Sequence, residues 1–228
     1  MQALDRLLRP RSVAIVGASA DTAKLSGRPL AYLEKYGFRG DIYPVNPRVA
    51  AIGGHRCYAD IGALPQAPDA AIVLLGAAKV IDAVRELAAI GTGAAIVLAG
   101  GFSETGDEGR ARQDDLKRAA GHMRLLGPNS IGLVNVGDRI VLSASNALVT
   151  DDIVPGSIAV VSQSGGILGS LLSRAQALGV GFSKLIATGN ESDLEVSDFI
   201  DYLAADPATK VIALYLDGLR KPTAFQVR

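Results

Sequence analysis

The sequence predicts an α/β protein with two doubly wound units, and three observations lead to that prediction. Seven short apolar runs are continuous and rich in β-branched residues, as expected for strands covered on both faces of a parallel sheet. Segments of helical length and amphipathic spacing lie between these runs. Small polar or glycine-rich turns follow several runs, at the points where a strand would pass into a helix.

The apolar runs give the expected strands in chain order. They are residues 13–17, 41–45, 70–75, 94–99, 157–162, 183–188 and 210–216. Helices are expected at residues 79–90 and 195–206, where apolar side chains recur on one helical face, and Pro207 marks the end of the second. A further helix is expected to begin at about Gly165.

The alternation of strands and helices breaks once, between about Leu126 and Pro155. This stretch has no helical period and is rich in Gly, Asn, Asp and Ser. We interpret it as the last strand of one domain and an irregular, hairpin-like connector, which predicts domains at residues 1–142 and 143–228. The second domain shows only three predicted strands, whereas a typical sheet has about five or six, and the domain is therefore expected to be incomplete.

Composition excludes several classes of protein. Lys and Arg number 23, equal to Asp and Glu, so a nucleic-acid or anionic-membrane surface, which needs a basic excess, is not expected. The single cysteine, Cys57, allows no disulfide within the chain and fits a cytoplasmic location. No apolar run has the length of a signal peptide or a membrane span, and we expect no metal site.

The turn after the first strand predicts an anion site. Gly17 ends that strand, and the free N–H groups of the helix that follows would favour a phosphate; a tight turn without a ligand is the alternative. Gly17, Ala18 and Ser19 lack the second glycine of the dinucleotide fingerprint. The second strand ends at Arg48 with no acidic residue, which suits a ribose phosphate, as in NADP or coenzyme A (CoA), unless Arg48 is simply solvated.

Two further strand ends project toward the same crevice, because ligands of open α/β sheets bind beyond the carboxyl ends of the strands. These ends are residues 74–79 and 98–109. Glu104 is the carboxylate that comes early in the second of them, and it is expected either to accept a hydrogen bond from a ligand or to cap the next helix.

A second anion-type turn lies in residues 156–175, where an apolar strand passes through a small polar turn into a helix. The start of a helix offers unpaired N–H groups, and the Ser164 hydroxyl could add a donor to a phosphoryl group. The alternative is a helix capped by Ser164 without any ligand, since serine is a good N-cap.

Five segments together resemble a known family. Residues 10–19, 37–48, 99–109, 125–135 and 158–166 are similar to the α part of NDP-forming acyl-CoA synthetases, relatives of the succinyl-CoA synthetase α subunit. The resemblance runs in order through nearly the whole chain, and the pair "GPNSIG" and "SQSGG" is its most specific part. It implies a Rossmann-like CoA-binding domain followed by a partial flavodoxin-like doubly wound domain.

The resemblance also implies a CoA site. The Ser19 turn would approach the CoA phosphates, residues 45–48 would line the adenosine side, and Pro128 and Asn129 would lie near the thiol end. The stretch 75–77 matches a wall of the site in which Gly76 replaces the usual proline. The implied CoA-binding residues are Gly17, Ala18, Ser19, Val45, Asn46, Pro47, Arg48, Leu75, Gly76, Ala77, Glu104, Pro128 and Asn129.

The second turn matches the place where this family docks a phosphohistidine. Its residues here are Gln163, Ser164, Gly165 and Gly166. Asp217 matches a glutamate that orients the histidine and is shorter by one methylene. The phosphorylated histidine itself lies beyond the region matched; His55 and His122 are in other contexts, and we expect both to be structural or surface residues.

By this resemblance the chain is the CoA-binding portion of a longer acid–CoA ligase. That enzyme would join a carboxylic acid to CoA with ATP, through an acyl phosphate and a phosphohistidine, and release ADP and phosphate. ATP, ADP and Mg²⁺ would bind outside this chain, on an ATP-grasp β domain or subunit, so the chain alone is expected to be inactive. Two alternatives stay open at this point: a non-catalytic, regulatory CoA-binding module, and an NADP-binding Rossmann oxidoreductase.

Overall fold

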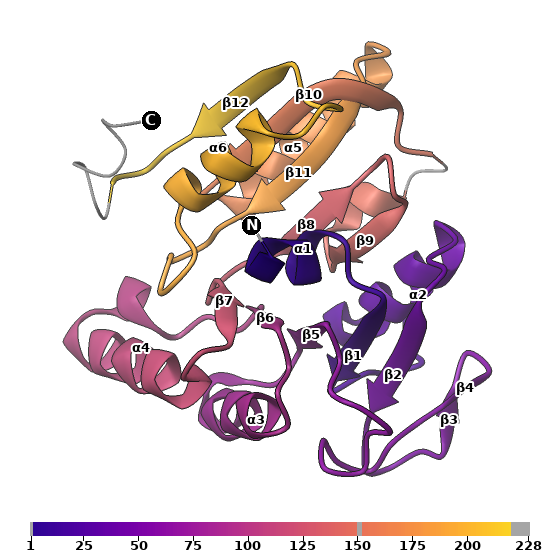
Figure 1. Ribbon diagram of the computed structural model, residues 1–228, viewed down its shortest axis with the longest axis vertical. Coiled ribbons are helices and arrows are strands. Elements are labelled where there is room, and N and C mark those ends of the chain that lie inside the picture. Colours follow the sequence, from indigo (N-terminus) through magenta and orange to yellow (C-terminus); the bar gives the residue numbers. More distant parts are fainter. Residues whose placement is uncertain (1, 150–151, 220–228) are drawn as a thin grey trace.

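Two β-sheets form the framework of the molecule (Figure 1). The computed structural model describes residues 2–149 and 152–219. The first sheet has five parallel strands in the order β2-β1-β5-β6-β7, so the crevice at its carboxyl edge opens beside β1, where the strand order reverses. Its strands are β1 (Ser12–Val16), β2 (Asp41–Val45), β5 (Ala70–Val73), β6 (Ala94–Val97) and β7 (Arg124–Leu126).

Helices cover both faces of the first sheet. On one face, the predicted apolar side chains of Val80, Val84 and Leu87 pack into a core with the sheet, as their helical spacing requires. The helices here are α3 (Ala77–Ala89) and α4 (Asp107–Ala120) on that face, and α1 (Gln2–Leu8) and α2 (Arg28–Lys35) on the other. Short elements complete this part: η1 (Leu25–Gly27), η2 (Ser103–Thr105), β3 (Ala51–Ile52) and β4 (His55–Arg56).

The second sheet is mixed. Three parallel strands, in positions the apolar runs predict, continue into an antiparallel hairpin in the order β12-β10-β11-β8-β9. Helix α5 covers one face and α6 the other. The elements are β8 (Gly132–Asn135), β9 (Ile140–Ser143), η3 (Asn146–Val149), β10 (Pro155–Ser162), α5 (Gly165–Ala177), β11 (Phe182–Ala187), α6 (Val196–Ala204) and β12 (Val211–Tyr215).

The change from one sheet to the other comes earlier than the predicted boundary between residues 142 and 143. The β8–β9 hairpin, which the sequence analysis gave to the first domain, hydrogen-bonds to β11 through residues 133–135 and belongs to the second sheet. Both hairpin strands are buried, and the backbone groups on the outer edge of β8 find their partners in β11 of that sheet. We therefore call residues 2–126 the first unit and 132–219 the second unit; the division into separate domains stays a prediction.

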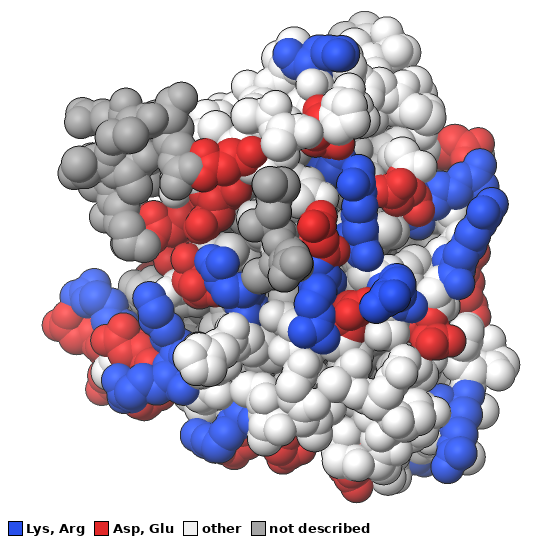
Figure 2. All heavy atoms as spheres, viewed as in Figure 1, with Lys and Arg blue, Asp and Glu red and all other residues white. Residues whose placement is uncertain are grey.

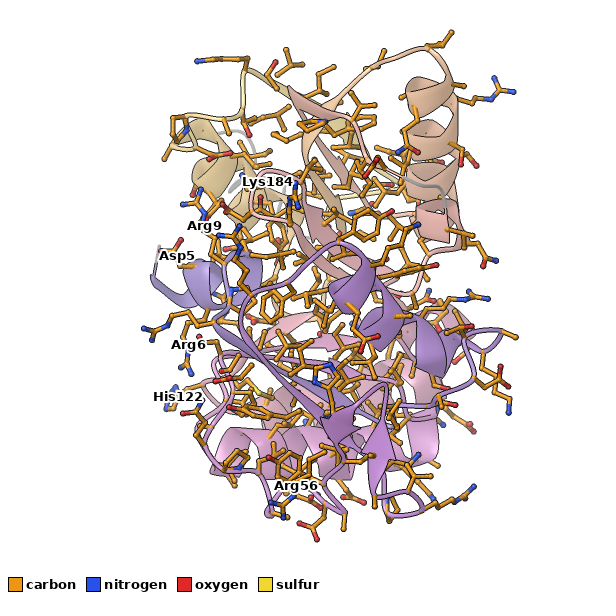
Figure 3. All side chains as sticks on the ribbon, turned by 90° about the vertical axis from the view of Figure 1, so that its right-hand side faces the viewer. Asp5, Arg6, Arg9, Arg56, His122 and Lys184 are labelled. Carbon is orange, nitrogen blue, oxygen red and sulfur yellow. The ribbon has the colours of Figure 1, made fainter. Side chains whose placement is uncertain are left out.

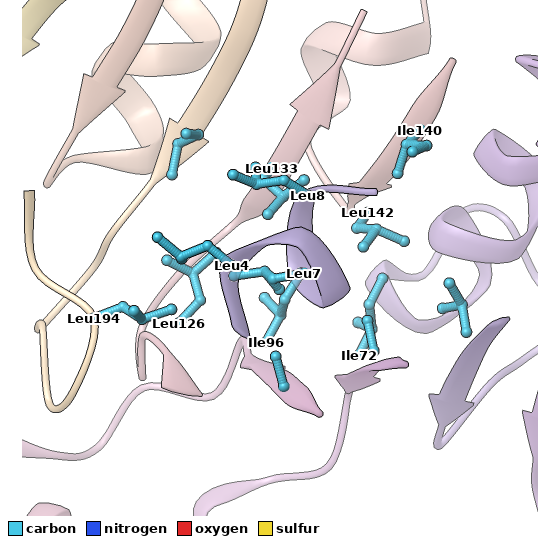
Figure 4. Close-up of a cluster of buried hydrophobic side chains, with 14 of the residues drawn as sticks. Leu4, Leu7, Leu8, Ile72, Ile96, Leu126, Leu133, Ile140, Leu142 and Leu194 are labelled. Carbon is cyan, nitrogen blue, oxygen red and sulfur yellow. The ribbon is translucent and has the colours of Figure 1, made fainter. Parts of the chain in front are cut away.

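The two units share one hydrophobic core, and α1 lies inside it (Figure 4). Leu7 and Leu8 have no exposed surface. They pack among Ile96 of the first sheet and Leu133 and Leu142 of the hairpin. Because one apolar cluster includes side chains from both sheets, the units bury their facing surfaces against each other.

A polar network joins α1 to the second unit beside this core (Figure 3). Lys184 of β11 and Asp206 form a buried ion pair, with 2.5 Å between Nζ and Oδ2, and Arg9 lies 3.5 Å from the other Asp206 oxygen. Although burial raises the pKa of Asp206, hydrogen bonds from Lys184 and Thr209 lower it below its usual value. A buried lysine and aspartate therefore compensate each other's charge at this junction.

Helix α2 fastens the connector that follows β9. Arg28 Nη1, Tyr32 Oη and Tyr36 Oη donate hydrogen bonds to carbonyl oxygens in residues 144–148, at 3.1, 2.9 and 3.0 Å. These donors recur at helical spacing and so lie on one face of α2. A helix of the first unit thereby fixes a loop of the second.

Candidate functional site

A crevice of about 470 Å³ lies at the carboxyl edge of the first sheet, beside β1. Loops after β1, β2 and β5 build its walls together with α3. The structure brings together here several of the residues expected to bind CoA. These are Gly17, Val45, Asn46, Pro47, Arg48 and Leu75.

Gly17 occupies a position that favours glycine for two reasons. Its φ is +86°, in the region that side chains with a Cβ rarely adopt. A Cβ there would lie 3.0 Å from the Leu75 side chain. Its N–H donates to Val45 O at 2.9 Å, so the turn after β1 is held close to the neighbouring strand ends.

Asn46 ties two turns of the crevice together. Its Nδ2 donates to Ala18 O at 2.8 Å, and its Oδ1 accepts from the Arg48 N–H at 2.9 Å. The Arg48 side chain is exposed at the rim, and within the described residues its guanidinium has no ion-pair partner. A guanidinium in this state can bind a phosphate through paired hydrogen bonds.

The other predicted residues near the crevice shape its edges. Ser19 belongs to the turn after β1, where its N–H donates to Ser26 O at 3.0 Å and its Oγ accepts from the Asp21 N–H at 3.1 Å. Gly76 is the N-cap of α3. Because glycine has no side chain, the first N–H groups of this helix, which begins at Ala77, have no side-chain acceptor at the cap.

The sequence analysis missed four charged residues of the crevice. One is a lysine and three are carboxylates, and they lie on α3 or in the loop after β4. Three of the four lie on α3 at helical spacing, and this spacing could have placed them on one face of the helix from the sequence alone. The four are Asp60, Lys79, Asp82 and Glu86.

A second and larger hollow, a cleft of about 1020 Å³, lies between the two units at the start of α5. The four residues expected to dock a phosphohistidine line it together with Asp217, which was expected to orient the histidine, so the structure brings the five together. They are Gln163, Ser164, Gly165, Gly166 and Asp217. Asn129, which was expected near the thiol end of CoA, lines the same cleft from the turn that follows the first unit.

The turn before α5 is built around Ser164. Ser164 is the N-cap, and its Oγ accepts from the Ile167 N–H at 3.3 Å, so the capping alternative raised by the sequence is present. Ser162 Oγ accepts from the Ser164 N–H at 3.1 Å and thereby fixes the conformation of the turn. No acidic side chain lies in the first turn of α5, which leaves that helix start favourable for an anion.

Gln163 holds the end of β12 against this turn. Its Oε1 accepts from the N–H groups of Asp217 and Gly218, at 2.6 and 3.0 Å, and its Nε2 donates to Gly218 O at 2.7 Å. The Gln163 side chain thus organises the turn that carries Asp217. The Asp217 side chain is exposed and remains on the cleft wall.

Glu191 is a neighbour of this turn that the sequence analysis did not identify. It is buried, it adopts a φ of +57°, and its Oε1 accepts from the Val196 N–H at 3.2 Å. Burial raises its pKa, although hydrogen bonds with Thr188 and Gln163 act in the opposite direction. The buried carboxylate of Glu191 thus hydrogen-bonds to Gln163, which organises the turn that carries Asp217.

Glu104 lies apart from both hollows, contrary to the expectation that it lines the CoA pocket. Its Oε1 accepts from the Gly101 and Phe102 N–H groups, at 2.5 and 3.2 Å, and its Oε2 accepts from Asn190 Nδ2 at 2.5 Å. Burial raises its pKa, but the hydrogen bonds from Asn190 and these backbone groups outweigh burial and lower it. The carboxylate organises its own loop and contacts the second unit.

Arg28 is a further cleft residue without a sequence signal. It lines the cleft from α2 while its Nη2 donates to Ala23 O at 3.1 Å. The two histidines lie elsewhere: His55 Nε2 is 3.1 Å from a Glu34 carboxylate oxygen, and His122 is exposed. Neither lines the crevice or the cleft.

The surface gives no sign of a polyanion site on the face drawn in Figure 2, where basic and acidic side chains are interspersed. Among residues 2–149 and 152–219, no cluster of His, Cys, Asp and Glu has the arrangement of a metal site. In the same described ranges, no helix combines the length and apolar character needed to cross a bilayer.

Two family models match successive parts of the chain. One, described as a CoA binding domain, matches residues 11–136, and the other, a succinyl-CoA ligase like flavodoxin domain, matches residues 155–227. The chain belongs to the CoA binding domain family. The resemblance of the sequence to the α part of NDP-forming acyl-CoA synthetases, and the Rossmann-like and flavodoxin-like fold it implied, are thereby confirmed.

Relatives agree with this assignment. The chain is 38% identical over 227 residues to a trans-feruloyl-CoA synthase from an unknown prokaryotic organism, covering 98% of this chain and 32% of that protein. It is 32% identical to the α subunit of ADP-forming acetate–CoA ligase II of Pyrococcus furiosus, covering 97% of this chain and 48% of the subunit. The chain therefore spans between about a third and a half of these relatives.

A solved structure has the same fold. The apo acetyl-coenzyme A synthetase 1 of Ca. Korarchaeum cryptofilum superposes with a TM-score of 0.91 at 32% identity, over 98% of this chain and 48% of that one. The agreement extends across both units, so the two structures share the arrangement of the two sheets.

Proposed function

We propose that this chain provides the CoA site and the phosphohistidine cradle of an ADP-forming acyl-CoA synthetase. In the whole enzyme a carboxylic acid, CoA and ATP would give acyl-CoA, ADP and phosphate, through an acyl phosphate and a phosphohistidine. One observation carries the proposal. This member of the CoA binding domain family has two hollows at strand ends, and each of them suits a phosphate or phosphoryl group.

The nucleotide end of CoA fits the crevice beside β1. The Gly17 turn allows a phosphate to come close to the backbone, and the exposed Arg48 guanidinium suits the 3′-phosphate of the ribose. The arm of CoA would then run toward Asn129, the predicted CoA residue that also lines the cleft. Lys79 adds a second cation to the phosphate side of the crevice.

The cleft at α5 fits the phosphoryl steps. The helix start offers N–H groups without an acidic neighbour, and a phosphoryl group of about −1.5 to −2 charge is favoured there. Gln163 fixes the turn that presents Asp217, whose carboxylate would orient a protonated imidazole. The histidine, the ATP and Mg²⁺ site and the ATP-grasp domain or subunit would come from outside this chain, as would part of the acid pocket.

Calorimetric titration of the chain with CoA, dephospho-CoA and NADPH tests the first half of the proposal. We expect CoA to bind, dephospho-CoA to bind more weakly, and NADPH to give no heat of binding. NADPH binding without a response to CoA would instead support an oxidoreductase. The second half is tested by acid- and CoA-dependent formation of ADP in the complete enzyme, and an enzyme that binds CoA without this turnover would be a non-catalytic module.

A further inference from the structure

A loop of the second unit reaches into the first unit next to the predicted thiol end of the CoA site. Gly189 has a φ of +61°, and a Cβ there would lie 2.3 Å from Pro128 O, so only glycine allows this approach. The next residue, Asn190, is 7% exposed, and its N–H donates to the same Pro128 oxygen at 2.9 Å. The loop therefore packs directly on the Pro128–Asn129 turn.

The Asn190 side chain contacts two residues of the first unit and one residue of the turn that follows it. Its Nδ2 donates to Glu104 Oε2 at 2.5 Å and to Gln113 Oε1 at 3.1 Å. Its Oδ1 accepts from Asn129 Nδ2 at 3.3 Å. Both amide hydrogens and the amide oxygen of this buried side chain are thus engaged.

The chemistry of Glu104 fixes which way both amides face. An ionised carboxylate can only accept hydrogen bonds, and hydrogen bonding keeps the pKa of Glu104 low, so Asn190 must present its NH₂ to it. Asn190 then presents its oxygen to Asn129, which in turn must present its own NH₂. The remaining atom, Asn129 Oδ1, is an acceptor, and no donor among the described residues reaches it.

Asn129 is exposed and lines the cleft, and a Cβ built on Gly100 would be 3.5 Å from its Oδ1. A ligand that passes Asn129 and offers a hydrogen-bond donor would meet an acceptor that has no donor among the described residues. The arm of CoA carries such donors, in its amide N–H groups and its terminal thiol.

We propose that Asn190 is a positioning residue that orients Asn129, so that Asn129 Oδ1 accepts a hydrogen bond from an amide N–H or the thiol of the CoA arm. This inference rests on the proposed function, because it needs CoA in the crevice. It adds a residue of the second unit to the determinants of CoA affinity, and it assigns Glu104 the role of fixing the orientation of two amides.

The test compares two probes on the same chain: CoA, and adenosine 3′,5′-bisphosphate, which carries phosphates but lacks the arm. Asn190→Ala is expected to raise the Kd for CoA about tenfold, as the loss of a hydrogen bond does, and to leave the Kd for the bisphosphate within about twofold. Asn190→Asp keeps the volume but places a carboxylate against Glu104, and it should weaken CoA selectively in the same way.

Asn129→Ala provides a second variant, at an exposed position. It should weaken CoA as much as Asn190→Ala does, and the double variant should be no weaker than either, because both changes remove one interaction. The matched control is Asn135→Ala, which removes another buried asparagine with contacts to α1, through Leu8 O at 3.0 Å. It should lower Tm and leave both Kd values unchanged.

Equal weakening of both probes by Asn190→Ala would show a merely structural role and overturn the inference. So would an unchanged Kd for CoA in Asn129→Ala, or fully additive effects in the double variant. A wild-type chain that binds neither probe would contradict the proposed function itself, and that result is distinct from the others.

Discussion

The crevice beside β1 and the cleft at the start of α5 differ in how many parts of the chain build them. Loops at one edge of the first sheet, with α3, form the crevice. The cleft draws residues from α2, from the Asn129 turn, from the connector after β9, from α5 and from the end of β12. Under the proposed function, nucleotide binding would depend on one sheet, whereas phosphoryl chemistry would depend on the alignment of two.

The largest effect should come from breaking the shared core. Leu7→Ala removes a fully buried side chain between the two sheets, and we expect a loss of about 2–5 kcal/mol in the free energy of unfolding. Because both units contribute to that core, urea unfolding should show a single transition at lower denaturant. Leu87→Ala is the control, since Leu87 is equally buried but packs on the far face of the first sheet. Two separate transitions in either variant would contradict a common core.

The next effect separates the cleft from the crevice. Ser164→Asp keeps a good N-cap but puts a negative charge where the phosphoryl group would dock. In the complete enzyme, acid-dependent ADP formation should fall about 100-fold, while the Kd for CoA should not change. Ser170→Asp, farther along α5 on the same cleft wall, serves as the control with a small effect. Normal turnover in Ser164→Asp would remove this residue from the phosphoryl site.

A charge reversal in the crevice should have the opposite selectivity. Arg48→Glu is expected to weaken CoA about tenfold, and dephospho-CoA much less, because the lost partner would be the 3′-phosphate. Arg139→Glu, at an exposed position outside the crevice, controls for the change in net charge. Calorimetry with both ligands measures the difference. Equal losses for the two ligands would show that Arg48 does not contact that phosphate.

The smallest effect concerns the buried carboxylate behind the cradle. Burial raises the pKa of Glu191 in the folded chain, so the unfolded chain loses this proton at lower pH than the folded chain does. The stability due to protonated Glu191 is thus full below its ordinary pKa of 4.5 and is lost as pH rises through the raised folded value. A tenfold difference between the two acid constants corresponds to about 1.4 kcal/mol.

Glu191→Gln does not titrate, so the stability of wild type relative to this variant should decline over that pH window. Urea midpoints of both proteins, measured in parallel from acid to neutral pH, give the difference directly. A constant difference between wild type and Glu191→Gln across the window would contradict the raised pKa.

The sequence predicted the parts of this molecule that depend on local patterns. Continuous apolar runs locate the parallel strands. The turn residues that follow these strands line the two hollows: Gly17 lines the crevice and Ser164 lines the cleft. Parallel strands end at the same edge of a sheet, so residues after different strands converge without any knowledge of the contacts. For this reason, residues of the crevice and of the turn before α5 could be predicted from the sequence.

What the sequence could not predict depends on pairing between distant segments. The β8–β9 hairpin joins the second sheet by pairing with β11, about 50 residues later, and no local pattern announces that partner. Glu104 looked like a ligand-binding carboxylate because its partner Asn190 is 86 residues away. Helix α1 was missed because its seven residues are stabilised by burial between two sheets rather than by helical propensity.

The location of α1 also bears on how pieces of this protein should be prepared. The match to the CoA binding domain begins at residue 11, after the helix has ended. A chain that begins at residue 11 and keeps both sheets would lose Leu4, Leu7 and Leu8, and the apolar surfaces that these leucines cover would open to water. Such a fragment should aggregate, so recombinant versions of this domain should retain the ten residues that precede the match.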